Sequence, residues 1–139
     1  MHPVNAPGGV EGFLSWLGDD THQIDHNIVN ARLHQETPLL LDDELVELAF
    51  KCGRDMWIYT NKRILQVDVQ GWSGKRVQYA TTPLRFATCF RARTSGLIDR
   101  DEEISIFFDG LGELEQDLRK GKADMWQIHT HLQSKLIKP

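Results

Sequence analysis

The sequence has few cysteines, no long hydrophobic run and no excess of positive charge. Its two cysteines, Cys52 and Cys89, are too few for a disulfide framework, and each lies in an apolar stretch typical of buried free thiols. No apolar run approaches the roughly 20 residues of a membrane-spanning helix, and the N-terminus lacks the features of a secretory signal. We therefore expect a soluble protein without a transmembrane segment, in the reducing cytoplasm.

The net charge and the absence of three sequence motifs argue against two further classes of protein, nucleic-acid-binding proteins and enzymes. The formal net charge of -4 argues against bulk nucleic-acid binding, because proteins that bind nucleic acid in this way usually carry a strong positive excess. The chain holds no Gly-x-Ser-x-Gly motif, no phosphate-binding glycine loop and no His-Glu-x-x-His motif. We expect neither enzymatic activity nor a cofactor.

Two groups of candidate metal ligands lack the spacing that a metal site needs. The acidic run between residues 99 and 103 does not fit an EF-hand loop, which requires a central glycine and a glutamate at position twelve. The pairs His22–His26 and His129–His131 lack the third and fourth ligands of a zinc site. The sequence therefore predicts no metal site.

The length of 139 residues suits one domain with attached N-terminal segments. Residues 1–10 are rich in proline and glycine and predict a flexible tail. Residues 11–38 predict an N-terminal helical segment, with one short helix in 11–20 and a second ending at Pro38. Residues 39–139 form the predicted main domain.

The second helix of this segment is predicted from its apolar spacing. Ile24, Ile28 and Ala31 recur at helical intervals, and either Thr21 or Asp25 is a suitable N-cap residue. This spacing predicts a helix that begins near one of these two caps.

After residue 44 the hydrophobic period changes from helical to alternating. Val46, Leu48 and Phe50 are expected on one face of a strand, with Glu47 and Lys51 on the other. The same alternation and intervening turns predict seven strands, in residues 44–51, 56–60, 63–69, 75–81, 84–93, 103–109 and 111–119. Short connections favour an antiparallel meander.

A final amphipathic helix follows the strands. Met125, Ile128, Leu132 and Leu136 fall on one stripe of residues 122–139. An antiparallel sheet must cover its apolar face, and this helix is the natural cover.

Residues 39 to 108 contain an acidic segment before the first strand, a Thr-Asn-Lys-Arg turn and a Val-Asp-x-Gln-Gly turn. Through these motifs the chain resembles the bacterial pleckstrin-homology-like family. The matching residues are Asp42, Glu44, Arg54, Asp55, Thr60, Asn61, Lys62, Arg63, Val67, Asp68, Gln70, Gly71, Gly74, Lys75, Tyr79, Pro83, Thr94, Gly96, Asp99, Asp101 and Glu103.

The resemblance implies a mainly β fold: a pleckstrin-homology-like, seven-stranded antiparallel sandwich capped by a C-terminal helix. It also implies that some members assemble as rings, and it implies no activity. The chain departs from the family pattern at Asp43, where the family has Gly, at Leu84, where it has Tyr, and at Arg93, where it has Glu.

Four cations near two predicted turns form a candidate anion-binding rim. Lys62, Arg63, Lys75 and Arg76 lie in or beside these turns, and the alternative is that they are simply solvated. The connection at residues 51–54 is short, which disfavours specific phosphoinositide binding and leaves weak contact with anionic lipid.

Three arginines and one tryptophan are candidate protein contacts. Arg85, Arg91 and Arg93 are predicted on one strand face, suited to a carboxylate-bearing partner or to cross-strand pairing with Glu47, Glu102 or Glu103. Trp72, in a glycine-flanked turn, either anchors a contact or folds back over Tyr79.

These patterns predict a non-catalytic binding or scaffold domain that self-associates or contacts other proteins. The alternative is a peripheral membrane module that binds anionic lipid headgroups through the basic rim.

Overall fold

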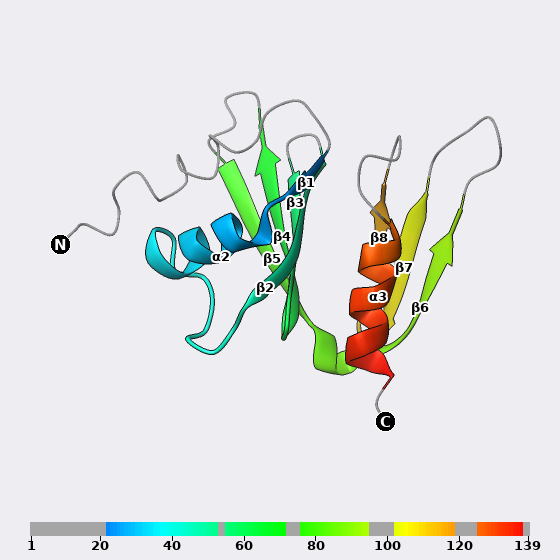
Figure 1. The fold of residues 1–139 in the computed structure, drawn as a ribbon. Helices are drawn as coiled ribbons and strands as arrows, with labels where there is room; N and C mark the ends of the chain where they lie inside the picture. The colour runs from blue at the N-terminus through cyan, green and yellow to red at the C-terminus, as the bar shows by residue number, and fades with distance from the viewer. Residues whose placement is uncertain (1–21, 53–54, 72–75, 95–101, 119–124, 138–139) are drawn as a thin grey trace. The chain divides into compact units, whose positions relative to one another are not determined.

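The computed structural model describes residues 22–52, 55–71, 76–94, 102–118 and 125–137 (Figure 1). The chain divides into two compact units, Met1–Thr82 and Pro83–Pro139. The helix predicted in residues 11–20 and the turn that holds Trp72 lie outside the described residues.

The first unit is built on a five-stranded sheet in the order β1-β2-β3-β4-β5. The pairs β1–β2, β2–β3 and β3–β4 are antiparallel, as expected for strands joined by short turns. Its elements are β1 (His22–Ile24), α2 (His26–Gln35), β2 (Val46–Cys52), β3 (Asp55–Thr60), β4 (Arg63–Gln70) and β5 (Arg76–Pro83).

Helix α2 begins after Asp25, whose Oδ1 accepts a hydrogen bond from the Asn27 N–H at 2.9 Å. This cap leaves Ile24 outside the helix, where it pairs with Ala49 as part of β1. The side chains on the sheet side are Val29 and Leu33, both completely buried, and not the residues whose spacing predicted the helix.

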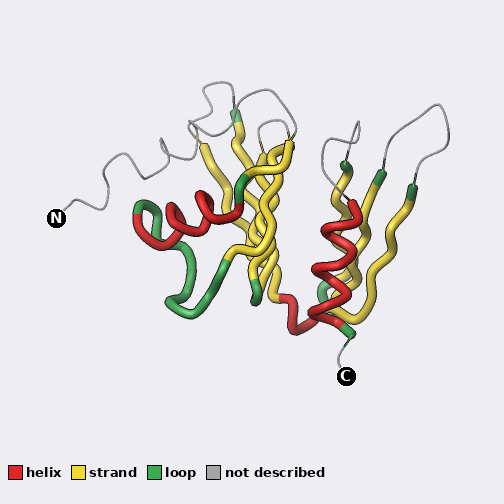
Figure 2. Tube along the Cα trace, in the orientation of Figure 1, coloured by secondary structure: helices red, strands yellow, loops and turns green. Residues whose placement is uncertain are grey.

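The two side chains Val29 and Leu33 are four residues apart and so lie one above the other on the helix. They join a core cluster from β2, β3 and β4 (Val46, Ala49, Met56, Ile58, Leu65 and Val67). By contrast, Ile28 is 51% exposed on the outer side of α2. Figure 2 shows the helix lying against one face of the first sheet.

A β-bulge in β2 overturns the predicted alternation of its side chains. Val46 pairs with Thr60 and Leu48 pairs with Tyr59, so the extra residue Glu47 has no counterpart on β3. The bulge moves Val46 to the face of Ala49, while Leu48 and Phe50 take the opposite face. Lys51, predicted on the solvent side, shares the face of Ala49 and is only 1% exposed.

The second unit contains a three-stranded antiparallel sheet in the order β6-β7-β8 and one long helix. Its elements are the 3-10 helix η1 (Leu84–Phe86), β6 (Ala87–Arg93), β7 (Glu103–Phe108), β8 (Gly112–Asp117) and α3 (Met125–Leu136). The turn between β7 and β8 depends on Gly110 and Gly112, whose φ angles of 76° and 88° favour glycine.

Helix α3 packs against β6 and β7 with the predicted stripe. Met125, Ile128 and Leu132 are buried, which confirms the face assigned from spacing. All seven predicted strands are present as β2 to β8, and β1 is an additional strand among the described residues.

Two details of the second unit differ from the sequence prediction. The strand predicted from residue 84 begins at Ala87, because residues 84–86 form η1. Cys89 is exposed rather than buried, since it lies on the outward face of β6 with Arg91 and Arg93.

Candidate functional site

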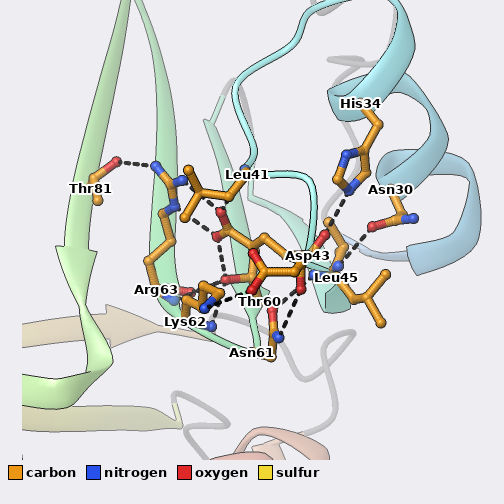
Figure 3. A network of polar contacts seen from close by, with 12 residues as sticks. Asn30, His34, Leu41, Asp43, Leu45, Thr60, Asn61, Lys62, Arg63 and Thr81 are labelled. Atoms are coloured by element: carbon orange, nitrogen blue, oxygen red, sulfur yellow. Dashed lines mark hydrogen bonds and ion pairs between the residues drawn. The ribbon is translucent and has the colours of Figure 1, made fainter.

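The most connected polar group in the first unit is centred on Glu44, which directly precedes β2. Its side chain is completely buried (Figure 3). Arg63, the first residue of β4, binds the carboxylate with two nitrogens: Nε lies 2.7 Å from Oε2, and Nη2 lies 2.6 Å from Oε1. This bidentate geometry is the strongest form of a carboxylate–guanidinium pair.

Two further donors complete the environment of the Glu44 carboxylate. The Thr60 hydroxyl donates to Oε2 at 2.7 Å, and the Leu41 N–H donates to Oε1 at 3.1 Å. Each carboxylate oxygen thus accepts two hydrogen bonds, which fills the roughly four lone-pair sites of the group. The saturated carboxylate has no acceptor site left for a metal ion or a substrate.

Thr60 also closes the turn between β3 and β4. Its hydroxyl oxygen accepts hydrogen bonds from the N–H groups of Lys62 (3.0 Å) and Arg63 (2.9 Å). A threonine that satisfies turn amides in this way replaces the missing ladder partners at the end of a hairpin. The turn that supplies Arg63 is therefore fixed by the same side chain that binds Glu44.

The pKa of Glu44 reflects two opposing effects. Burial alone raises the pKa of the carboxyl, but hydrogen bonds from Arg63, Thr60 and Leu41 outweigh burial and hold the pKa below its usual value of 4.5. The same contact raises the pKa of Arg63. Both groups are therefore charged in the folded protein at neutral pH.

The network also reaches the helix and the neighbouring strand. His34 Nε2 in α2 donates to the Glu44 carbonyl oxygen at 2.6 Å, and Asn30 Oδ1 accepts from the Val46 N–H at 2.9 Å. Arg63 Nη1 donates to the Thr81 hydroxyl of β5 at 3.2 Å. Through these contacts the loop before β2 is tied to α2, to the β3–β4 turn and to β5 (Figure 3).

Two exposed leucines, Leu41 and Leu45, project from the backbone that this network holds, and we refer to this pair as the leucine surface (Figure 3). Each is 55% exposed. Glu44 holds Leu41 twice, since the Leu41 N–H binds Oε1 and the Leu41 carbonyl accepts from the Glu44 N–H at 3.0 Å. Asn61 holds Leu45 twice, through its Oδ1 at 2.8 Å and its N–H at 3.0 Å.

The residues of the predicted anion-binding rim occupy different environments. Arg63 is bound to Glu44 and only 18% of its side chain is exposed. Lys62 Nζ lies 3.3 Å from Asp43 Oδ2, with 42% and 75% of the two side chains exposed. Arg76 is exposed at the start of β5, and Lys75 lies outside the described residues. Lys62 and Arg63 are thus brought together, and each already faces a carboxylate.

The three arginines predicted on one strand face do not form a row. Arg85 lies in η1, 4.7 Å from the ring centroid of Phe86, so its predicted place on the strand was wrong. Arg91 lies 5.3 Å from the Phe107 ring centroid, and Arg93 forms an ion pair with Glu103 at 2.5 Å. The Arg93 pair is one of the cross-strand contacts that the sequence offered as the alternative.

Sequence analysis matched Glu44, Thr60 and Asn61 to a family signature without assigning them a role. Glu44 follows Asp42 and Asp43 in the sequence, so no local pattern distinguished it as a buried charge, and the family signature was the one signal that singled it out. Over the described residues, no cluster of His, Cys, Asp or Glu suits a metal ion, and no helix is long and apolar enough to span a bilayer.

Solved structures with the same fold identify the class of protein. The structure is similar to a family protein with a pleckstrin-homology domain from Shewanella loihica PV-4, with a TM-score of 0.74, 30% identity, and coverage of 86% of this chain and 100% of that one. A pleckstrin-homology domain from Shewanella amazonensis SB2B gives a TM-score of 0.68 at 29% identity, covering 89% and 97% of the two chains. The fold is therefore pleckstrin-homology-like.

The sequence places the chain within a particular family. Residues 19–136 match the sequence model of the bacterial PH domain, and the chain belongs to that family. It is also 39% identical over 86 residues to the uncharacterized protein YjqA of Bacillus subtilis (strain 168), covering 62% of this chain and 68% of that protein.

Proposed function

We propose that this chain is a non-catalytic PH-like binding and scaffold domain that self-associates through the leucine surface. The observation that carries the proposal is the double backbone anchoring of two exposed leucines, Leu41 by Glu44 and Leu45 by Asn61. An apolar side chain that is exposed yet rigidly held loses little conformational entropy when a partner covers it.

A second copy is the partner that the neighbouring charges favour. Beside the leucines, Lys62 and Asp43 present opposite charges on exposed side chains. In a two-fold contact the same patch meets itself, so an exchange of this ion pair between the two copies would form twice. Apolar anchors within a polar, self-complementary rim are typical of protein contact sites.

The chemistry of the Glu44 network supports a structural and not a catalytic role. A catalytic carboxylate must exchange a proton or contact a reacting atom, whereas all acceptor sites of Glu44 are occupied by groups of its own chain. The network instead positions the backbone from which the two leucines project.

Absolute mass by light scattering behind a sizing column tests the proposal. We expect a mass at least twice 16.0 kDa at both low and high salt, because apolar contacts are not screened by ions. The double variant Leu41→Ser/Leu45→Ser is expected to be a folded monomer, since both substitutions keep the backbone hydrogen bonds. A wild-type monomer at high concentration would contradict the proposal.

Leu111→Ser is the matched control for this experiment. Leu111 is 61% exposed in the β7–β8 turn of the second unit, outside the leucine surface. Its substitution removes about as much exposed apolar area as Leu41→Ser or Leu45→Ser alone and is expected to leave the mass unchanged. An equal effect of both variants would indicate non-specific apolar association instead.

Anionic lipid is the alternative ligand, and sedimentation with vesicles containing anionic phospholipid tests it. Lys62→Glu/Arg76→Glu is the suitable variant, because Arg63 cannot be changed without breaking the Glu44 network. Binding to vesicles that falls with salt and with this variant would support the lipid alternative. Absence of vesicle binding at low salt would exclude it.

A further inference from the structure

The outward side of helix α3 carries no charged residue. Its exposed side chains, counting the residue that follows the helix, are Trp126, Gln127, Thr130, Gln133, Ser134 and Ile137. Lys135, the charged residue of α3, is half-buried, and its spacing from Trp126 places it on the opposite side of the helix. Surface helices usually carry charges on the side that faces water. Loss of charge from an exposed surface is typical of the centre of a protein contact.

Four of the exposed residues form one line, which we call the outer stripe of α3 (Trp126, Thr130, Gln133 and Ile137). They follow one another at intervals of four, three and four residues, which places them on one face of a helix. The Ile137 N–H donates to the Gln133 carbonyl oxygen at 3.0 Å, so the helical geometry reaches Ile137. Trp126 is 58% exposed and Ile137 is 66% exposed. A large apolar side chain thus lies at each end of the stripe, about 16 Å apart.

The outer stripe points away from the sheet that α3 covers. Figure 1 shows α3 along one face of the β6-β7-β8 sheet, and the buried side chains of the helix face that sheet. On the outer side, the Trp126 ring lies 5.5 Å from the His129 ring, which lies 5.0 Å from the Phe90 ring of β6, measured between centroids. These contacts hold the indole before a partner arrives, so little conformational entropy is lost on binding.

The order of side chains in the outer stripe is nearly the same from either end. A large apolar residue comes first and last, and Thr130 and Gln133 lie between them. When two copies of the helix pack antiparallel about a two-fold axis, Trp126 of each copy faces Ile137 of the other. Thr130 then faces Gln133 of the other copy, whose amide can donate to the threonine hydroxyl. Every position of the stripe thereby meets a side chain that suits it.

The net charge of the chain favours a second copy at this face in particular. Each copy carries a formal net charge of -4, and like charges oppose association over most of the surface. The outer stripe brings no charge into such a contact. A charged partner protein would find no opposite charge in the stripe, and an anionic membrane would find no lysine or arginine among the exposed residues of α3.

We propose that the outer stripe of α3 is a self-association surface that pairs antiparallel with the outer stripe of a second copy. The Trp126 indole of each copy packs on Ile137 of the other, so the contact forms at both ends. It uses none of the residues of the leucine surface and does not depend on the proposed function. A copy that holds both surfaces can bind two neighbours, and assembly can then extend beyond a dimer.

The outer stripe forms a weak contact on its own. Four side chains of a 12-residue helix bury less than the roughly 1,200 Å² of a standard protein interface. The Leu41→Ser/Leu45→Ser variant is therefore still a monomer at the dilution of a sizing column. A reaction that traps the helix pair covalently is the suitable way to detect it.

Disulfide trapping between two cysteine variants tests the contact and its direction. Trp126→Cys and Ile137→Cys are each placed in a chain with Cys89→Ser, Leu41→Ser and Leu45→Ser, which removes the exposed thiol and the leucine surface. In an antiparallel pair of the two variants, the cysteines face each other at one end, and the native contact remains at the other.

We expect the mixture of the two variants to form about tenfold more disulfide-linked dimer than either variant alone. The reason is that two copies of the same variant hold their cysteines about 16 Å apart, which is beyond the reach of a disulfide.

Two controls separate this contact from random collision. Leu111 is 61% exposed in the β7–β8 turn, and a mixture of Leu111→Cys with Trp126→Cys should give no excess of linked dimer. Thr130→Lys/Gln133→Lys, added to both trapping variants, places like charges opposite each other and should reduce the yield about fivefold or more. Thr130→Lys/Gln133→Glu places opposite charges in the same geometry and should retain the yield.

Several results would overturn the proposal. Equal trapping in the mixture and in each variant alone would show a parallel or random contact. No trapping of the mixture at about 1 mM protein, with both variants folded by circular dichroism, would show that the stripe does not self-associate. Absence of trapping together with sedimentation on vesicles of anionic phospholipid would assign the stripe to a lipid surface. Because every variant lacks the leucine surface, failure here is distinct from failure of the proposed function.

Discussion

At the scale of single residues, Glu44 shows how a carboxylate withstands complete removal from water. Its hydration is replaced by four hydrogen bonds, three of them from Arg63 and Thr60 side chains. Such a pair adds little net stability compared with a well-packed apolar pair, but it is costly to break, because one charge is then left without its partner.

Replacement of Glu44 by Gln is therefore expected to destabilise the protein by about 3 kcal/mol at neutral pH. The amide turns an N–H₂ group toward the Arg63 guanidinium and leaves that cation uncompensated. Urea unfolding followed by circular dichroism measures the change. Asp43→Asn is the matched control, since it removes a carboxylate from an exposed pair and should cost about 1 kcal/mol or less. Equal effects would contradict the assignment.

The lowered pKa of Glu44 predicts that stability falls in acid. In the unfolded chain the carboxyl binds a proton near its usual pKa of 4.5, while in the folded protein it does so only at lower pH. Between these two values the unfolded state holds more protons, so stability decreases as the pH falls through the folded pKa. Urea unfolding between about pH 3 and pH 7 should show this fall.

Glu44→Gln removes the carboxyl group that titrates. The free energy of unfolding of this variant should therefore decrease less in acid than that of the wild type. The two curves are expected to differ most at neutral pH and to converge in acid, where Glu44 is protonated in the wild type as well. Parallel curves over the whole range would show that Glu44 does not contribute to the pH dependence.

At the scale of secondary structure, local sequence patterns predicted which segments form strands and helices. They did not predict the bulge in β2 or the residue at which α2 begins. The alternation of apolar and polar residues predicted β2 to β8, and the helical spacing of apolar residues predicted the buried stripe of α3. Both patterns arise from residues close together in the sequence. The bulge at Glu47 depends on the register against Tyr59 and Thr60, which alternation within one strand does not contain. The first residue of α2 depends on whether Thr21 or Asp25 serves as the N-cap, and the sequence alone did not decide between them.

The candidate site was harder to predict from the sequence, because its contacts join residues that are far apart in the chain. Glu44 and Arg63 are 19 residues apart, and no local pattern indicates that they pair. The basic turn was visible, but the carboxylates that face Lys62 and Arg63 come from the loop before β2. The positive charge of the turn therefore did not reveal that Lys62 and Arg63 each already face a carboxylate.

The observed face of α2 predicts contrasting effects of two neighbouring substitutions. Leu33→Ala should destabilise the protein by about 3 kcal/mol, because it leaves a cavity in the core of the first unit. Ile28→Ala removes a half-exposed side chain of similar size and should change stability by about 0.5 kcal/mol or less. Thermal unfolding compares the two, and a reversed order would contradict the packing of α2.

At the scale of the whole molecule, the proposed leucine surface lies in the first of the two units into which the chain divides. Self-association through that surface would bring several copies of the domain together. Assembly of this kind multiplies the number of binding sites for a partner, which is what a scaffold requires.

Self-association predicts that thermal stability depends on protein concentration. For a dimer, a tenfold rise in concentration favours the associated state by about 1.4 kcal/mol and should raise the midpoint by about 3 °C or more. Leu41→Ser/Leu45→Ser should remove this dependence while the Leu111→Ser control retains it. Scanning calorimetry at two concentrations measures both, and a midpoint independent of concentration in the wild type would contradict association.

The short strand β1 has a consequence for aggregation. Its three residues pair with residues 49–51 and thereby cover part of one edge of β2, a strand that contains Val46 and Phe50. An uncovered edge of this apolar composition is a template for cross-β growth. Proteolysis near residue 25 is therefore expected to release fibril-forming material while leaving the rest of the chain intact, which links the lifetime of the protein to a strand of only three residues.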